Sequence, residues 1–296
     1  IDAFQPDALL VFGWSFHSHL KAIRHYSGRI PILFRGDSNL LDEHPGFSIR
    51  KSLRRLFLRW LYRHVDVALY TGQANLAYYK TAGLKEHQLV FAPHAVDNAR
   101  FYDPDGQVQQ QADAWRSELG IPTGALVFLF AGKLEPKKDP FLLLDAFLEL
   151  AAPNMWLVIA GNGILEDALK TKAAGHPRIL FVGFRNQREM PVLYRVADVF
   201  VLPSRGPGET WGLSVNEAMA SGRAVIVSDQ CGCAADLVGE NGFSFPACDK
   251  EALKSTMVRF FNNPESAHAS GTAGKRLITS WDIPELARAI EGITCN

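Results

Sequence analysis

Several features are scarce or absent in this 296-residue sequence, and each excludes a class of protein. The four cysteines show neither a paired CxxC spacing nor the density of a disulfide scaffold, which argues against a zinc site and favours a reducing cytoplasm. No run of about 18 apolar residues and no basic-then-apolar leader is present, so neither a membrane span nor a signal peptide is expected. Lys+Arg and Asp+Glu balance at 31 each, so no overall basic field marks a nucleic-acid binder.

What the sequence does contain is an alternation of short apolar runs with helical patterns. Its length and 47% hydrophobic content are sufficient for two domains with separate cores. Strands alternating with helices predict parallel sheets with right-handed crossovers, an α/β fold. The expected strands are 7–13, 30–35, 66–71 and 88–92 in the first half, and 125–131, 156–160, 179–182, 199–202, 224–228 and 243–245 in the second.

The domain boundary is expected near residue 105, inside the polar segment 102–113. This divides the chain into an N-terminal domain, residues 1–105, and a second Rossmann-like domain, residues 106–280. Four strands make a small sheet for such a domain, so the first domain is expected to lack its initial units. Residues 281–296 are expected to form a C-terminal helix.

The segment 203–229 joins a loop to a helix start. Pro203 and three following Gly and Pro residues break regular structure, and a helical apolar pattern then begins near Gly212. Unpaired amides at a helix start favour an anion such as phosphate. Glu209 precedes this start and Glu217 lies eight positions later, inside the helix. A retaining glycosidase pair would need about 5 Å between the carboxylates, and the loop leaves that separation open. We favour hydroxyl binding, one carboxylate to a ribose diol and one to a sugar.

This segment resembles the E-x7-E signature of the retaining glycosyltransferases of family four (glycosyl transferases group 1). It reads Glu209-Thr-Trp-Gly-Leu-Ser-Val-Asn-Glu217, followed by AMASGRAV. The stretch FAPHAVDNARF, residues 91–101, resembles the family's interdomain segment, with His94 and Ala95 in place of Asn-Gly. The resemblance covers residues 90–292 well and 1–90 loosely. It implies a GT-B fold, two Rossmann-like domains facing a cleft, with the helix at 281–296 returning to the first domain.

The family's diphosphate motif also has a counterpart, in the loop Gly132-Lys133-Leu134-Glu135-Pro136-Lys137-Lys138. Lys133 stands where arginine is usual, and Lys138 matches the family's lysine. A lysine supplies the charge of an arginine without its bidentate fork. Two cations in such a loop can neutralise a diphosphate, so Lys133 and Lys138 are expected to hold it and to stabilise the leaving group.

The resemblance implies further donor contacts. Glu217 would hold the ribose diol, and Glu209 would orient the sugar and terminal phosphate together with the backbone of Trp211, Gly212 and Leu213. Gly161 and Gly183 would form tight turns, and the backbone at Phe184 would contact the base. A dinucleotide fingerprint is not expected at Gly161-Asn162-Gly163, because Glu166 occupies the third glycine position.

The group nearest the donor sugar is less well defined. Related transferases place a histidine after the second strand seen here, whereas this chain reads Phe34-Arg35-Gly36-Asp37. Arg35 is therefore the candidate catalytic residue, with Asp37, His17 and His19 as alternatives. A metal pair at His17 and His19 is not expected, because residues two apart on a helix face different ways.

Residues 48–64, SIRKSLRRLFLRWLYRH, predict a strongly amphipathic helix. Its apolar residues follow helical spacing, and six cations occupy much of the remainder. The simpler interpretation is an apolar face packed on the sheet and a solvated charged face. The alternative is a patch for anionic lipid headgroups or an anionic acceptor, which would give peripheral contact at the inner membrane surface. The apolar residues are Ile49, Leu53, Leu56, Phe57, Trp60 and Leu61.

Taken with the family resemblance, these features predict a retaining glycosyltransferase. The donor would be a UDP-, GDP- or ADP-sugar, and the acceptor a hydroxyl of a glycan, a lipid-linked sugar or a small molecule, as in polysaccharide or glycolipid biosynthesis. No cofactor, obligatory metal or nucleic-acid partner is implied. Two alternatives stay open: a non-catalytic nucleotide-sugar binding protein, suggested by the departures at Lys133 and Arg35, and a GT-B sugar-nucleotide epimerase, which the E-x7-E form disfavours.

Overall fold

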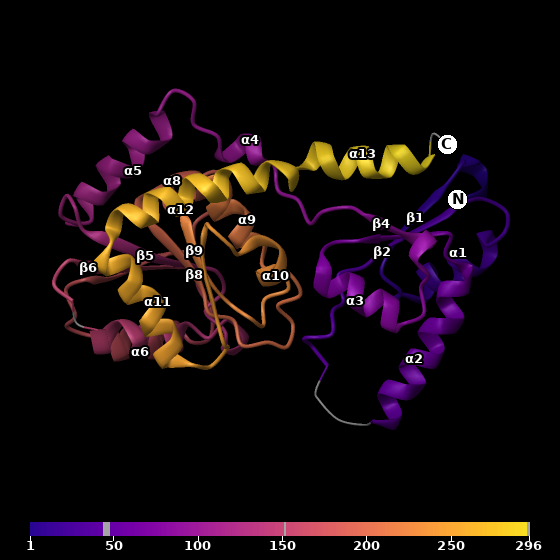
Figure 1. Cartoon of the computed structure of the whole chain (residues 1–296), viewed down its shortest axis with the longest axis horizontal. Helices are drawn as coiled ribbons and strands as arrows, with labels where there is room; N and C mark the ends of the chain where they lie inside the picture. The colour runs from indigo at the N-terminus through magenta and orange to yellow at the C-terminus, as the bar shows by residue number, and fades with distance from the viewer. Residues whose placement is uncertain (44–47, 151, 295–296) are drawn as a thin grey trace. The chain divides into compact units, whose positions relative to one another are not determined.

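A computed structural model describes residues 1–43, 48–150 and 152–294 (Figure 1). The chain forms two compact units, one made of Ile1–His94 with Ile283–Asn296 and the other of Ala95–Asp282. Each unit has its own parallel sheet flanked by helices. The predicted α/β fold class is confirmed.

The sheet of the Ala95–Asp282 unit has six parallel strands in the order β10-β9-β8-β5-β6-β7. Read from β7, this is the 3-2-1-4-5-6 order of a Rossmann fold. All six strands occur where the sequence predicted them, with ends displaced by one residue at most. They are β5 (Leu126–Ala131), β6 (Met155–Ala160), β7 (Ile179–Gly183), β8 (Val199–Leu202), β9 (Ala224–Ser228) and β10 (Gly242–Phe245).

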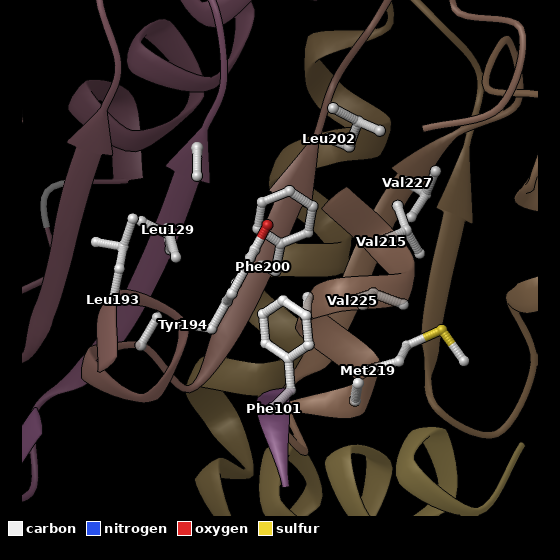
Figure 2. Close-up of a cluster of buried hydrophobic side chains, with 14 of the residues drawn as sticks. Phe101, Leu129, Leu193, Tyr194, Phe200, Leu202, Val215, Met219, Val225 and Val227 are labelled. Carbon is white, nitrogen blue, oxygen red and sulfur yellow. The ribbon is translucent and has the colours of Figure 1, made fainter. Parts of the chain in front are cut away.

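Helices cover both faces of this sheet, because successive residues of a strand point to opposite sides. On β5, Phe128 and Phe130 belong to the core cluster that includes residues of α6 and α11, whereas Val127 and Leu129 belong to the cluster with α8 and α9, part of which Figure 2 shows. The helices are α4 (Asn98–Phe101), α5 (Gln107–Glu118), α6 (Pro140–Leu150), α7 (Glu166–Ala173), α8 (Met190–Val196), α9 (Leu213–Ala220), α10 (Ala234–Leu237), α11 (Lys250–Asn262) and α12 (Pro264–Leu277).

The other unit has a four-stranded parallel sheet in the order β1-β2-β3-β4, again at the predicted positions. Its core includes Ile23, Phe34, Leu58 and Tyr79. The strands are β1 (Leu9–Phe12), β2 (Ile32–Arg35), β3 (Val67–Tyr70) and β4 (Leu89–Phe91), and the helices are α1 (His17–Tyr26), α2 (Ile49–Leu61), α3 (Gln73–Thr81) and α13 (Ile283–Thr294). Across the described residues, no helix is long and apolar enough to cross a membrane.

The helix predicted at 48–64 forms, but most of the apolar side chains expected to pack on the sheet are exposed to solvent. Leu58 and Leu61, three residues apart, are the buried residues of α2. Ile49, Leu53 and Leu56 are 69%, 61% and 66% exposed. The stripe that meets the core is therefore rotated from the predicted one and includes Leu58, which the predicted stripe left out. An apolar surface remains among the cations.

The division between the units falls after His94 rather than near residue 105. Phe101 is fully buried in the core of the Ala95–Asp282 unit, and Asn98 donates a 2.9 Å hydrogen bond to the Ile278 carbonyl. Trp281 also belongs to this core, and the unit ends at Asp282. The C-terminal segment therefore begins at Ile283, two residues later than the expected start at 281. Residues 295 and 296 of that segment lie outside the described residues.

Candidate functional site

The site is positioned by the strand order. β5 and β8 are neighbours, but the chain continues from β5 to β6 on one side and from β8 to β9 on the other. Loops that leave a parallel sheet in opposite directions open a crevice at the carboxyl ends of the strands. The loop after β5 carries Lys133 and Lys138, and the loop after β8 carries Glu209. Both predicted motifs therefore flank the point where ligands bind in such sheets.

Glycines bring the neighbouring loops into backbone contact. The Gly132 amide donates to the Ala160 carbonyl at 3.0 Å, and the Gly161 amide donates to the Gly183 carbonyl at 2.8 Å. A Cβ at Gly161, where φ is +132°, would lie 1.9 Å from the Gly132 carbonyl oxygen. Only glycine fits this contact. Gly161 thus has a packing role at the ends of β5 and β6.

A pocket of about 290 Å³ opens beside these turns, with walls from the loops after β5, β6 and β7 and from α8 and α9. Five of the predicted donor-binding residues line it: Gly132, Lys133, Gly161, Phe184 and Glu217. Lys133 supplies a cation from one wall and Glu217 a carboxylate from another. Phe184 is 66% exposed. The residues that line it without having been predicted are Ala131, Ala160, Asn162, Arg185, Met190, Leu193, Tyr194 and Ser214.

Glu217, on α9, is held by a residue of α8. The Tyr194 hydroxyl donates a 2.7 Å hydrogen bond to Oε2 of Glu217. Burial raises the pKa of the Glu217 carboxyl, while the Tyr194 hydrogen bond and the charge of Arg100 act in the opposite direction. The pocket thus contains a half-buried carboxylate with a fixed donor on one oxygen.

Glu209 and Lys138 contact each other, and neither is among the residues that line this pocket. Glu209 is 7% exposed, and its Oε2 accepts a 2.9 Å hydrogen bond from the Ser204 hydroxyl. The Lys138 amine forms an ion pair with the same oxygen. The structure therefore brings together the residue expected at the diphosphate and the residue expected at the sugar.

The predicted helix start at Gly212 is confirmed, since α9 begins at Leu213. Gly212 has φ +101°, and a Cβ there would lie 2.8 Å from Leu202 Cδ2. Trp211 does not face solvent: it is buried, its indole nitrogen donates to Asn216 Oδ1 at 2.8 Å, and its ring stacks on Trp281 with centroids 5.1 Å apart. Trp211 therefore fixes the loop, and its side chain has a packing role.

Arg35 has a structural environment within its own unit. It is buried, and its two terminal nitrogens each donate a 2.9 Å hydrogen bond, to the carbonyls of Ala92 and Pro93. These bonds anchor the segment that leads to His94. Burial, reinforced by the charge of Arg35, lowers the pKa of His94 to about 4. Contact of Arg35 with a donor sugar stays a prediction.

Sequence reasoning did not identify Tyr194 and Ser204 as site residues. Tyr194 lies in a helix of mainly apolar residues and is typical of a core position, and Ser204 carries no motif of its own. The packing of the folded chain brings Tyr194 to Glu217 and Ser204 to Glu209. Among residues 1–43, 48–150 and 152–294, no cluster of three or more His, Cys, Asp or Glu side chains is arranged to hold a metal ion.

Two parallel sheets, one of them in Rossmann order with a pocket at its switch point, define a GT-B fold, and solved structures agree. HepE of Anabaena in complex with UDP matches 97% of this chain and 78% of its own length, with a TM-score of 0.79 and 19% identity. Sucrose-phosphate synthase of Thermosynechococcus elongatus matches 97% of this chain and 72% of its own length, with a TM-score of 0.77 and 20% identity.

The family described as "Glycosyl transferases group 1" matches residues 111–277, and the chain belongs to this family. A GDP-mannose-dependent monoacylated alpha-(1-6)-phosphatidylinositol monomannoside mannosyltransferase of Corynebacterium glutamicum is 27% identical over 77% of this chain. A lipopolysaccharide core biosynthesis mannosyltransferase of Rhizobium leguminosarum is 32% identical over 73% of this chain. The chain spans 62% and 60% of the length of these two relatives.

Proposed function

We propose that this protein is a glycosyltransferase that moves a sugar from a nucleoside diphosphate sugar to an acceptor hydroxyl with retention of anomeric configuration. The observation that carries the proposal is the pocket at the switch point, where Lys133 and Glu217 face one ligand space. The relative named as GDP-mannose-dependent and the neighbour in complex with UDP support a nucleotide-sugar donor. A UDP-, GDP- or ADP-sugar fits the proposal.

Each donor group has a chemical counterpart in the site. Glu217 accepts hydrogen bonds from the ribose diol, and Lys133 and Lys138 neutralise the diphosphate. Glu209 and the first amides of α9 orient the sugar and the terminal phosphate. Lys138 exchanges part of its interaction with Glu209 for the phosphate as the donor binds. The cations then stabilise the charge that develops on the departing diphosphate.

Retention requires the acceptor hydroxyl to attack the face of the sugar from which the diphosphate leaves. The bond from the anomeric carbon to the phosphate oxygen breaks, the bond to the acceptor oxygen forms, and the acceptor proton passes to the departing phosphate. NMR of the product's anomeric proton tests this assignment. An inverted product would contradict it.

The experiment for the donor site measures nucleotide affinity and sugar transfer for Glu217→Ala and Lys138→Ala. UDP-, GDP- and ADP-sugars are first screened by thermal shift, because a bound ligand stabilises the folded state. Loss of a charged hydrogen-bond partner is expected to weaken binding by roughly tenfold or more. The control is Lys170→Ala, whose amine pairs with Glu166 on the surface of α7. Unchanged affinity and transfer in both site variants would refute the assignment.

The same assay separates the alternative functions. Binding without transfer to any acceptor would indicate a nucleotide-sugar binding protein. Release of free nucleotide with an epimerised sugar, in the absence of an acceptor, would indicate an epimerase. Transfer to an added acceptor supports the proposed activity.

We also propose that the exposed face of α2 contacts anionic lipid at the inner membrane surface, where a lipid-linked acceptor would be found. This α2 face consists of the exposed residues Ile49, Leu53, Leu56 and Trp60. The cations of the same segment are Arg50, Lys51, Arg54, Arg55, Arg59 and Arg63, of which Arg63 follows the end of α2. Apolar side chains beside cations match the chemistry of an anionic bilayer surface. The relative named as acting on a phosphatidylinositol monomannoside supports a lipid acceptor, and glycans and small molecules are the other acceptor classes to test.

A further inference from the structure

Tyr194 combines a rigid apolar environment with one polar contact. It is fully buried, and its ring packs edge-on against Phe101 and Phe200, with centroid distances of 6.1 and 5.6 Å (Figure 2). A tyrosine buried in such a cluster normally directs its hydroxyl to a polar partner. Here that partner is Glu217, with 2.7 Å between the hydroxyl and Oε2. The hydroxyl is therefore held in place by the core.

A fixed donor has two effects on the Glu217 carboxylate. It limits the rotation of a long side chain, whose ordering would otherwise oppose ligand binding. It also compensates part of the cost of burying the charge, because a hydrogen bond to a carboxylate is stronger than one between neutral groups. Since Oε2 is engaged by Tyr194, Oε1 is the oxygen that can face the ligand.

We propose that Tyr194 is a positioning residue that orients Glu217 toward the ribose diol and thereby makes the pocket selective for ribonucleotides over deoxyribonucleotides. The inference rests on the proposed function, since it concerns the same donor pocket. Tyr194 itself acts through Glu217.

Other charged groups near Glu217 come from different elements and do not replace the tyrosine. Arg100, on α4, acts on Glu217 through its charge and donates a 2.9 Å hydrogen bond to Gln187. Lys133 and Arg185 line the same pocket, and Arg185 donates to the Val182 carbonyl at 2.8 Å. The short neutral donor of Tyr194 is thus the group whose removal acts most directly on the carboxylate.

The test measures dissociation constants by calorimetry for UDP, GDP and ADP, and then for the 2′-deoxy and 3′-deoxy forms of the tightest binder. The proteins are the full chain, Tyr194→Phe, and the control Tyr102→Phe, at an exposed tyrosine of the same unit. The wild type should bind the ribonucleotide tenfold or more tighter than its deoxy forms. Tyr194→Phe should lose most of this ratio, chiefly by weaker binding of the ribonucleotide, and Tyr102→Phe should keep it.

A second readout distinguishes positioning from general loosening of the core. Loss of the hydroxyl removes an interaction that lowers the pKa of Glu217, so ribonucleotide affinity in Tyr194→Phe should begin to fall at higher pH than in the wild type. An unchanged ribose-to-deoxyribose ratio with an unchanged pH profile would overturn the inference. Wild-type chain that binds none of the three nucleotides would overturn the proposed function itself.

If Tyr194→Phe melts at a lower temperature and its folding is in doubt, Glu217→Gln provides the same test from the other residue. It keeps the size of the side chain and the contact with the tyrosine but removes the charge. It should lose the ribose-to-deoxyribose ratio as well, and the double variant should lose little more. Independent, additive losses in the two variants would contradict a shared action on the diol.

Discussion

Lys138 forms an ion pair with Glu209 through Oε2, the same oxygen that accepts the 2.9 Å hydrogen bond from Ser204. Both side chains are mostly buried, 16% and 9% exposed. A charge removed from water is tolerated when a partner and hydrogen bonds compensate it. The structure thus shows how the loop after β8 accommodates an acidic group at the carboxyl edge of the sheet.

The first prediction concerns the stability of this pair. Lys138 and Ser204 are the two donors observed at the Glu209 carboxylate. Lys138→Met removes one of them and leaves this nearly buried carboxylate with the Ser204 hydroxyl. We expect the free energy of unfolding to fall by roughly 3 kcal/mol, the lower end of the cost of removing one member of a buried pair. Urea unfolding followed by tryptophan fluorescence measures it.

The control for this prediction is the double variant Lys138→Met with Glu209→Gln. It removes both charges, so it should be less destabilised than the sum of the two single variants. Strict additivity would show that the two charges do not interact in solution.

The second prediction concerns the backbone contact between Gly161 and Gly132. A methyl group in Gly161→Ala would fall 1.9 Å from a carbonyl oxygen and would also require φ +132° in a residue with a Cβ. The loops after β5 and β6 must separate, at a cost of about 3 kcal/mol in the free energy of unfolding, with weaker nucleotide binding.

Gly239→Ala is the matched control, because among the described residues no heavy atom beyond the glycine and its two chain neighbours lies within 4 Å of the added Cβ. Its melting temperature and nucleotide affinity should stay close to those of the wild type. If the two alanine variants behaved alike, the close approach at Gly161 would not exist in solution.

Much of the fold was predictable because it depends on local patterns. The run Leu126–Ala131 is apolar on both faces, which is typical of a strand covered on both sides, and β5 forms there. Gly212 and the apolar pattern after it indicated where α9 begins. The E-x7-E spacing then placed Glu209 in the loop and Glu217 inside the helix, as observed.

The remaining features depend on contacts between residues far apart in the sequence. Tyr194 reaches Glu217 only because α8 and α9 pack together, and Lys138 meets Glu209 only because β5 pairs with β8. The face of α2 was assigned to the core because apolar periodicity shows which residues share a side of a helix. It does not show whether a neighbour covers that side.

The third prediction concerns pH and His94. Its pKa is lowered to about 4 by burial and by Arg35, with Asp37 acting in the opposite direction. In the unfolded chain this histidine binds a proton below about pH 6.5. The contribution of the neutral His94 to the free energy of unfolding is therefore complete above that pH and is lost as pH falls toward 4. His94→Asn introduces the residue usual in the family, which does not titrate in this range. The free energy of unfolding of this variant should therefore fall by up to about 3 kcal/mol less than that of the wild type as the pH is lowered to 4.

Unfolding free energies of the wild type and of His94→Asn between pH 4 and 7.5 test this. His87→Asn, at an exposed histidine, provides the control and should retain the wild-type dependence. Parallel pH curves for the wild type and His94→Asn would mean that His94 titrates normally in the folded protein.

The fourth prediction concerns the α2 face and vesicles of anionic lipid. Arg54 donates a hydrogen bond to Tyr78 and Arg55 to Glu43, so their removal would also disturb the fold. The informative charge variant is therefore Arg50→Gln, Arg59→Gln and Arg63→Gln. We expect the wild type to sediment with vesicles containing phosphatidylserine and this variant to lose most binding, since each cation near the surface contributes about 1 kcal/mol.

The apolar part of the α2 face is tested separately by Leu53→Ser with Leu56→Ser. Both leucines are more than 60% exposed, so the substitution should leave the melting temperature nearly unchanged while weakening vesicle binding.

The control for the arginine variant is Lys85→Gln, Arg188→Gln and Arg276→Gln, which removes the same number of charges from other exposed positions. If this control lost as much vesicle binding as the arginine variant, the net charge of the protein would explain the binding without a specific role for the α2 face. No binding by the wild type would refute the membrane contact. Binding that needs both the arginines and the leucines would show insertion of the α2 face into the lipid interface, because net charge alone does not depend on Leu53 and Leu56.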